Sequence, residues 1–549
     1  MRGRVCRVPA HIPDVHIMPQ TTLSSWPLAA PAKPLTPPAS GRPIHRGLDR
    51  GLVYATVATL FAFLVLALLL AATRPPQSDE GHFANAGAAL AAQGRFVMPM
   101  WTTWIPTLDQ RVYSNMPLYF LALGAWFKAF GVSWMSFRVL SVLFGVVMVL
   151  SLLATFRSIS RERGAFIAAL ILVALNYDLV NLSSARYDVM TAALSWAGIA
   201  SYLAMRERSL DRAVLVANTF LAAACMTHPY ALFGMIGLAT FAIVLDRRAI
   251  RARHVALAAA PYVVALAGWG AYIAKDPAMF RAQFAENASG RLQSHLGPLG
   301  LIGAEIRERY LGRFAGWRPG APPLMRVKVV LLVAYAAGLV GCAALPRIRA
   351  NAAARALVLF SATSLLLLMV VDAHRWYVYL IYVLPQLVLC LALVTHEVSR
   401  IGMWGRWTAR VGLASFALFT VASVGYRAAL DVHHRAFLPA VSFLRAHVRE
   451  GDLVIAGGEF GLGLGFEQHV LDDPTFGFRS HRVPAYAVLS TDSHERLDAV
   501  SATDSAAGAY VKKLLAGMRP VFESKAGSVR YEVLARNASA MPETTNRVR

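Results

Sequence analysis

A series of long apolar segments most constrains what this chain can fold into. The first segment, from Gly51 to Thr73, carries no charged residue. At 1.5 Å per residue, a helix of this length crosses a hydrocarbon core of ~30 Å. The sequence therefore predicts an all-α polytopic membrane protein with about eleven transmembrane helices. The later apolar segments lie near residues 138–156, 164–182, 187–205, 213–227, 230–245, 255–274, 327–345, 356–371, 377–395 and 411–430.

The composition agrees with a membrane protein. The chain is 56% hydrophobic and 15% charged, whereas an ordinary soluble domain is about 25% charged. A net charge of +23 would suggest nucleic acid as a partner of a soluble protein. In a membrane protein, however, basic residues first report loop orientation, so we predict membrane lipids and no nucleic acid as partners. The four cysteines are scattered and show neither a metal spacing nor a disulfide framework.

Arginines in alternate loops predict the orientation, because cytoplasmic loops are rich in Lys and Arg. The N-terminus is expected in the cytoplasm, and segments 74–137 and 431–549 are expected outside it. Arg is far more frequent than Lys and Ala is abundant, which suggests a GC-rich bacterial genome and hence the plasma membrane, the bacterial inner membrane. The basic loops carry Arg157, Arg161 and Arg163; Arg206, Arg208 and Arg212; Arg247, Arg248, Arg251 and Arg253; Arg347, Arg349 and Arg355; and Arg400, Arg406 and Arg410.

Three regions are expected along the chain. Residues 1–50 are rich in Pro and Arg without hydrophobic periodicity, which predicts a disordered basic tail; a start of translation nearer Met18 is an alternative. Residues 51–430 form the predicted transmembrane domain, with 74–137 as an outer loop. Residues 431–549 form a predicted small soluble α/β domain outside the cytoplasm.

The C-terminal segment shows soluble patterning. It predicts an amphipathic helix over Ala436–Arg449 and a buried strand over Asp452–Ala456. The glycine-rich run from Gly457 to Gly465 follows that strand and invites comparison with dinucleotide-binding loops. Its glycine spacing fits such loops poorly and little nucleotide is present outside the cytoplasm, so a loop near an acceptor channel is the preferred interpretation.

The first acidic group follows the first span. A helix over 78–92 capped by Ser78 would place Asp79 and His82 on one face. Ionisable residues near lipid usually face a protein interior or a water-filled cavity. Alternatively, Asp79 and Glu80 only complement the dipole at the start of this helix.

Two further polar groups are predicted at the same membrane face. Asp188 lies at the mouth between the third and fourth spans, and residues 372–377 fill another turn. Taken singly, each group could lie at a span end by chance, because Arg, Trp and Tyr are common there. Together the groups predict a cavity that carries carboxylates with cations nearby.

Six motifs follow one another along the chain: Asp79-Glu80, Gly94-Arg95-Phe96-Val97-Met98-Pro99, Met116-Pro117-Leu118-Tyr119-Phe120, Phe137-Arg138-Val139-Leu140-Ser141, Ala185-Arg186-Tyr187-Asp188, and Arg375-Trp376-Tyr377 through Pro385. In this order they resemble the motifs of the polytopic glycosyltransferases of the GT-C fold, in the branch of protein mannosyltransferases and lipid A aminoarabinose transferases. The ordered similarity covers about residues 50–395. One departure is Asn115, which stands where many relatives carry Lys.

The resemblance implies transfer of a sugar, by a hexosyl- or pentosyltransferase, from a polyprenyl phosphate donor to a lipid, glycan or protein acceptor. It implies Asp79 as the base, with Glu80 and Asp188 orienting the substrates. A divalent metal cation is an optional cofactor, with Asp79 and Asp188 as its ligands. The residues expected to bind substrate, chiefly the donor phosphate, are His82, Arg186, His228, His374, Arg375 and Tyr377.

Two other classes of protein are alternatives. A polytopic transporter or lipid flippase would also be apolar and basic inside. Transporters commonly show repeated halves and polar groups near the bilayer midplane, whereas here no internal repeat is visible and the acids gather at one face. A noncatalytic subunit of an envelope assembly would keep the fold and lose turnover, but the presence of both Asp79-Glu80 and Asp188 argues against it.

Overall fold

The computed structural model of the protein describes residues 50–184, 186–288, 296–318, 321, 323–466 and 470–537. The predicted basic tail lies outside these residues, apart from Arg50. Within the described part, seven helical stretches are long and apolar enough to cross a membrane. They contain α1 (Arg50–Thr73), α4 (Trp134–Ile159), α9 (Leu232–Asp246), α10 (Ala252–Ile273), α13 (Lys328–Ala344), α15 (Ala352–Val371) and α17 (Met403–Leu430).

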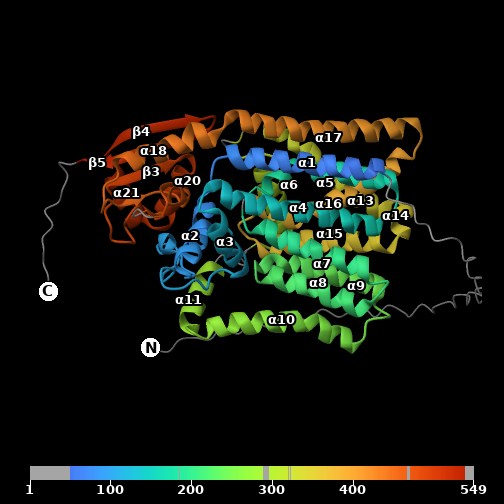
Figure 1. Ribbon diagram of the computed structural model, residues 1–549. Coiled ribbons are helices and arrows are strands. Elements are labelled where there is room, and N and C mark those ends of the chain that lie inside the picture. Colours follow the sequence, from blue (N-terminus) through green and yellow to red (C-terminus); the bar gives the residue numbers. More distant parts are fainter. Residues whose placement is uncertain are drawn as a thin grey trace, which may run out of the picture. The chain divides into compact units, whose positions relative to one another are not determined.

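Each of the other predicted spans also coincides with one helix or with two consecutive helices. The polytopic helical fold is therefore confirmed (Figure 1). The elements of these spans are α5 (Arg163–Ala174) with α6 (Tyr177–Leu182), α7 (Asp188–Met205), α8 (Leu210–Cys225), and η5 (Tyr377–Tyr382) with α16 (Leu384–Ser399). Further short helices are α3 (Leu118–Phe130), η2 (Pro229–Ala231) and α14 (Pro346–Ala350).

The span predicted over 164–182 is broken into α5 and α6 at Asn176. The Asn176 side chain accepts hydrogen bonds from the backbone N–H groups of Asp178, at 3.0 Å, and Leu179, at 3.1 Å. Asn at such a position satisfies the free N–H groups of a new helix, so it starts α6 instead of continuing α5. A single polar residue within an apolar segment thus interrupts the helix.

The helices pack around one apolar core. Pairs such as α4 with α7, α7 with α8 and α13 with α16 are in contact, and their facing side chains are buried together. Helix α10 lies along α8, but most of its side chains remain exposed. Exposed apolar side chains such as Val263 and Leu266 on α10 fit a lipid environment, because the hydrocarbon core has no water to exclude.

The outer loop begins with α2 (Ser78–Gln93), followed by the short helix η1 (Pro99–Trp101) and α3. The predicted helix over 78–92 is present, but Ser78 is not its cap. Gln77 is the N-cap residue, and Ser78 is the first helical residue. The hydroxyl of Ser78 instead makes a contact with the C-terminal domain.

A second loop links α10 to α13. It contains α11 (Pro277–Ala288), α12 (Pro298–Ala304), the π-helix η3 (Glu305–Phe314) and η4 (Pro323–Val327). The side chain of Gln283 in α11 joins this loop to the first one, because its Oε1 accepts a hydrogen bond from the backbone N–H of Tyr113 at 2.7 Å.

The C-terminal domain is α/β, as predicted. Its five strands are ordered β2-β1-β3-β5-β4; β2, β1 and β3 are parallel, and β5 pairs antiparallel with β3 and β4. The glycine-rich run was expected as a loop, which is wrong for six of its nine residues, because Glu459–Leu464 forms α19 and packs on α2. The elements are η6 (His433–Phe437), α18 (Leu438–His447), β1 (Val454–Ile455), α19, β2 (Val470–Leu471), β3 (Tyr486–Ser490), α20 (Thr491–Thr503), α21 (Ser505–Ala516), β4 (Met518–Ala526) and β5 (Val529–Arg536).

Candidate functional site

Arg186 joins the two acidic motifs that the sequence singled out. It lies between α6 and α7, and its backbone φ of 98° is one that residues other than glycine rarely adopt. Its Nη1 makes an ion pair with Asp79 of α2, and its Nε donates to Oδ2 of Asp188 in α7 at 2.9 Å. One guanidinium therefore bridges carboxylates from two helices, and the uncommon backbone conformation is of the kind that gathers at functional sites.

The two carboxylates differ in exposure. The side chain of Asp79 is 45% exposed, whereas that of Asp188 is 3% exposed. Burial lowers the pKa of Arg186, but the charges of Asp79 and Asp188 outweigh burial and raise this pKa well above its ordinary value. Arg186 is therefore a permanent cation, and Asp79 is the carboxylate of this pair that a bound molecule can reach.

Aromatic side chains line this bridge. The guanidinium carbon of Arg186 lies 5.6 Å from the ring centre of Phe83 and 5.7 Å from that of Tyr187, within the range of cation–π attraction. The ring of His228 stacks on Tyr187 at 4.8 Å.

Tyr382 donates its hydroxyl to Oδ1 of Asp188 at 3.1 Å. Sequence reasoning missed Tyr382, although it follows the expected Tyr377 closely in the same tyrosine-rich element.

Glu80 has a different environment from its neighbour Asp79. It is 0% exposed; Nε of Arg138 donates to its Oε2 at 2.9 Å, and Arg74 makes an ion pair with its Oε1. Burial raises the pKa of Glu80, but the charges of Arg138 and Arg74 outweigh burial and hold this pKa below its ordinary value. Glu80 therefore joins α2 to the end of α1 and to α4. Both of its carboxylate oxygens are paired with these arginines.

His82 lies against the C-terminal domain. Its Nε2 is 2.9 Å from Oδ2 of Asp472, and its ring stacks on Trp101 at 4.5 Å. Sequence reasoning missed Asp472 entirely, because no local pattern around it indicates a partner so far away in the chain. The structure thus places His82 in the contact between α2 and the C-terminal domain, whereas Asp79 contacts Arg186.

Arg375 belongs to a second charged network. Its Nη1 donates to Oε2 of Glu308 at 3.1 Å, and its φ of 53° is again left-handed. The neighbouring Arg309, fully buried, donates to Glu305 at 2.5 Å and to Asp372 at 2.8 Å. The π-helix η3 therefore holds the turn over 372–377, and the predicted site residue His374 is exposed on that turn beside Trp376.

Tyr377 takes part in a third network inside the bundle. Its hydroxyl donates to Oδ1 of Asp178 at 2.6 Å, and Nζ of Lys328 donates to the same oxygen at 2.5 Å. Lys328 also lies 4.0 Å from the ring centre of Phe314. This network links α6, α13 and η5. Sequence reasoning missed Asp178 and Lys328, although a charge inside an apolar span requires a partner.

The structure brings together only part of the predicted site. Asp79, Arg186, Asp188 and His228 share one cluster, which we call the acidic site, and Glu80 anchors the helix that carries Asp79. Within the described residues, no group of three His, Cys, Asp or Glu side chains is placed to hold a metal ion. Arg186 contacts both Asp79 and Asp188, the expected ligands of an optional divalent cation.

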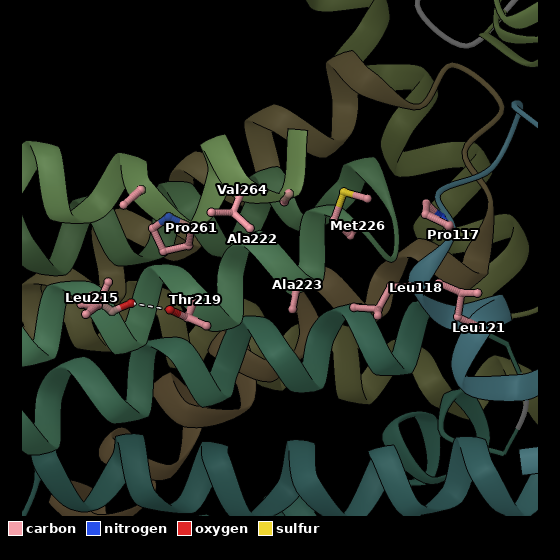
Figure 2. A pocket seen from close by; sticks show the side chains of 12 residues that line it. Pro117, Leu118, Leu121, Leu215, Thr219, Ala222, Ala223, Met226, Pro261 and Val264 are labelled. Atoms are coloured by element: carbon pink, nitrogen blue, oxygen red, sulfur yellow. Dashed lines mark hydrogen bonds between the residues drawn. The ribbon is translucent and has the colours of Figure 1, made fainter. Parts of the chain in front are cut away.

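An apolar groove lies between α3, α8 and α10 (Figure 2). Its volume is about 480 Å³. Leu118 and Met226 line one end, and Leu215 and Pro261 lie toward the other (Figure 2). The backbone N–H of Leu118 donates to the carbonyl of Met226 at 2.8 Å. Because His228 follows Met226 closely and stacks on Tyr187, this end of the groove leads toward the acidic site.

The chain has the GT-C fold of polytopic membrane glycosyltransferases. ArnT from Cupriavidus metallidurans, in a structure bound to undecaprenyl phosphate, is similar with a TM-score of 0.54 and 16% identity; the match covers 90% of this chain and 100% of ArnT. The oligosaccharyltransferase of Archaeoglobus fulgidus, in its apo form, is similar with a TM-score of 0.50 and 11% identity, over 89% of this chain and 75% of that one. No protein-family model and no curated protein matches the chain.

Proposed function

We propose that this protein is a glycosyltransferase that moves a sugar from a polyprenyl phosphate donor to an acceptor nucleophile. The observation that carries the proposal is the bridge of Arg186 between Asp188 and the half-exposed Asp79. Glycosyl transfer from a lipid phosphate needs a base for the nucleophile's proton and a cation for the charge that develops on the leaving phosphate. The acidic site offers one of each, side by side.

In the proposed reaction, the acceptor oxygen forms a bond to the anomeric carbon while the bond from that carbon to the phosphate oxygen breaks. Asp79 takes the acceptor's proton, and polyprenyl phosphate leaves with the electron pair of the broken bond. Arg186 stabilises the negative charge that develops on this phosphate, because a guanidinium binds phosphate oxygens in a bidentate manner. This reaction includes no step at a metal ion.

The ion pair between Arg186 and Asp79 suggests an order of binding. A carboxylate paired with a guanidinium is a weak base, since the positive charge favours its ionised form. When the donor phosphate binds Arg186, it competes with Asp79 for the guanidinium and leaves Asp79 more basic. We therefore expect the donor to bind before the acceptor is deprotonated.

The apolar groove is our proposed location for the donor's polyprenyl tail. From Leu215 to Met226, α8 advances about 16 Å at 1.5 Å per residue, which is long enough for several isoprene units. The end at Met226 leads to His228 and the acidic site, so a tail in the groove would place its phosphate near Arg186. The similarity in fold to ArnT, whose structure contains undecaprenyl phosphate, supports a donor of this kind.

Five further expected residues have roles in the proposal. Asp188 orients Arg186, His228 lines the path of the donor, and Glu80 holds the helix that carries Asp79. His374 and Arg375 lie on a turn that η3 holds, where they would contact the donor phosphate as it enters. The sugar, a hexose or a pentose, is transferred to a lipid, glycan or protein acceptor.

The proposed location is the plasma membrane, with the N-terminus in the cytoplasm. Arg-rich loops at alternate span ends support this orientation. The acidic site and the C-terminal domain would then lie outside the cytoplasm, where a donor must be membrane-anchored because nucleotide sugars are made inside. The GT-C fold, with its ion-paired acidic site beside a large outer loop, favours an enzyme over a transporter or flippase.

Replacement of the base tests the proposed function. Asp79→Asn should slow transfer about 100-fold or more while the protein stays folded and inserted, since a positioned base contributes that much. Asp188→Asn should also impair transfer, because Arg186 would lose one of its two anchors. Asp109→Asn, an exposed residue of the same loop, is the matched control and should keep normal turnover. Near-normal turnover of purified Asp79→Asn would reject the role of Asp79.

A further inference from the structure

Asp472, just beyond β2 in the C-terminal domain, binds the first turn of α2. Its Oδ2 accepts hydrogen bonds from the Ser78 hydroxyl at 2.6 Å and from the Gly458 N–H at 2.8 Å, and it lies 2.9 Å from Nε2 of His82. Its Oδ1 accepts from the indole N–H of Trp104 at 3.3 Å. The Asp472 side chain is 4% exposed. A buried carboxylate with several donors fixes the groups around it, because each lost hydrogen bond would leave a buried polar atom unsatisfied.

Asp79 lies in the turn of α2 whose other residues are held by buried contacts. Ser78 and His82 are four residues apart, so they lie on one face of α2, and both contact Asp472. Glu80 is held from the other side by Arg138 and Arg74. Asp79 is the half-exposed residue within this turn, and its neighbours on both sides are anchored.

The backbones of α2 and the C-terminal domain also touch directly. A Cβ atom added at Gly81 would lie 1.8 Å from the carbonyl oxygen of Gly458, and one added at Gly458 would lie 2.4 Å from the carbonyl oxygen of Ser78. Side chains at these positions would force the two segments apart. This contact therefore leaves little freedom for α2 to shift relative to α19.

We infer that Asp472 is a positioning residue, which sets where the Asp79 carboxylate stands relative to Arg186 and the acceptor. The inference rests on the proposed function, in which Asp79 is the base. Proton transfer requires the base within hydrogen-bonding distance of the acceptor, and a misplacement of about 1 Å can cost about 100-fold in rate. The C-terminal domain thus contributes to catalysis without contacting the reacting atoms.

The test compares Asp472→Asn with Asp473→Asn. The amide at position 472 has nearly the same shape but lacks the charge, and its NH2 group must face a donor. Its kcat should fall about 10-fold or more, while the KM values for donor and acceptor change less than about 3-fold. Asp473 accepts hydrogen bonds from the N–H groups of Thr475 and Gly477 within its own loop. Asp473→Asn should therefore lower thermal stability and keep kcat, as a merely structural role predicts.

A second pair of variants applies if Asp472→Asn fails to fold. Ser78→Ala removes one donor to Asp472 and should lower kcat, and Ser78→Thr, which keeps the hydroxyl, should restore it. If Asp472→Asn does fold, adding Ser78→Ala to it should lower kcat by less than the product of the two single effects, because the two residues share a hydrogen bond.

The outcomes separate this inference from the proposed function. If Asp79→Asn is inactive while Asp472→Asn and Ser78→Ala keep wild-type kcat, Asp472 positions nothing and the inference is overturned. If Asp79→Asn itself retains turnover, the proposed function fails, because Asp79 is then not the base. The result we expect is a fall in kcat in both Asp472→Asn and Ser78→Ala, with KM values that change less than about 3-fold and with a normal kcat for Asp473→Asn.

Discussion

The buried ion pairs of Glu80 offer a quantitative test of how α2 is held. The substitution Glu80→Gln removes the negative charge and keeps the size of the side chain. Arg138, which is 0% exposed, would then keep the backbone carbonyls of Ala71, at 2.5 Å, and Arg74, at 3.4 Å, as acceptors. A guanidinium with only uncharged acceptors in a buried site is strongly destabilised.

The magnitude follows from this geometry. Removing one partner of a buried ion pair costs about 3–5 kcal/mol of the free energy of unfolding. Because two carbonyl acceptors remain for Arg138 and the glutamine oxygen can accept one hydrogen bond, we expect about 3 kcal/mol, the lower end of that range. This change lowers the ratio of folded to unfolded protein by about 150-fold.

The assay is reversible unfolding in mixed micelles by titration with SDS, followed by circular dichroism. The matched control is Glu523→Gln, which makes the same substitution in an ion pair with Arg530 where both side chains are about half exposed. That control should change stability by less than about 1 kcal/mol, since solvent screens exposed pairs. Equal, small losses in both variants would refute the assignment of Glu80 as the anchor of α2.

Two further predictions concern acid stability and orientation. The charges of Arg138 and Arg74 hold the pKa of Glu80 below its ordinary 4.5. The contribution of Glu80 to the free energy of unfolding is therefore complete above pH 4.5 and is lost as the pH falls through the lowered pKa. When unfolding is measured at several pH values, the free energy of unfolding of Glu80→Gln should fall less steeply in that acidic range. In intact spheroplasts, an impermeant thiol reagent should label a cysteine placed at the exposed Lys512 and spare one at Arg248, and the opposite pattern would invert the proposed orientation.

The spans were predictable because long apolar segments in water-poor surroundings have few alternatives to helices. The same reasoning gave the helix over 78–92 and the strand near Val454, both of which are present. It also placed Asp79, Arg186 and Asp188 at one end of the bundle, where the structure joins them. Element type and rough location are thus set by local hydrophobic pattern.

The partners of individual charges were not predictable. Asp79 and Glu80 are adjacent, yet successive residues of a helix point about 100° apart, so one meets Arg186 and the other meets Arg138. His82 contacts Asp472 across 390 positions of sequence, and no local pattern encodes that distance. Arg138 could have indicated the environment of Glu80, because a charge within an apolar span requires a buried partner.

The central claim is that the sugar comes from a polyprenyl phosphate. Purified protein reconstituted in vesicles should be offered a radiolabelled polyprenyl phosphate sugar and, in parallel, the corresponding nucleotide sugar. We predict transfer to acceptor from the polyprenyl phosphate sugar, abolished by Asp79→Asn, and no transfer from the nucleotide sugar. Transfer from the nucleotide sugar alone would contradict the proposed mechanism.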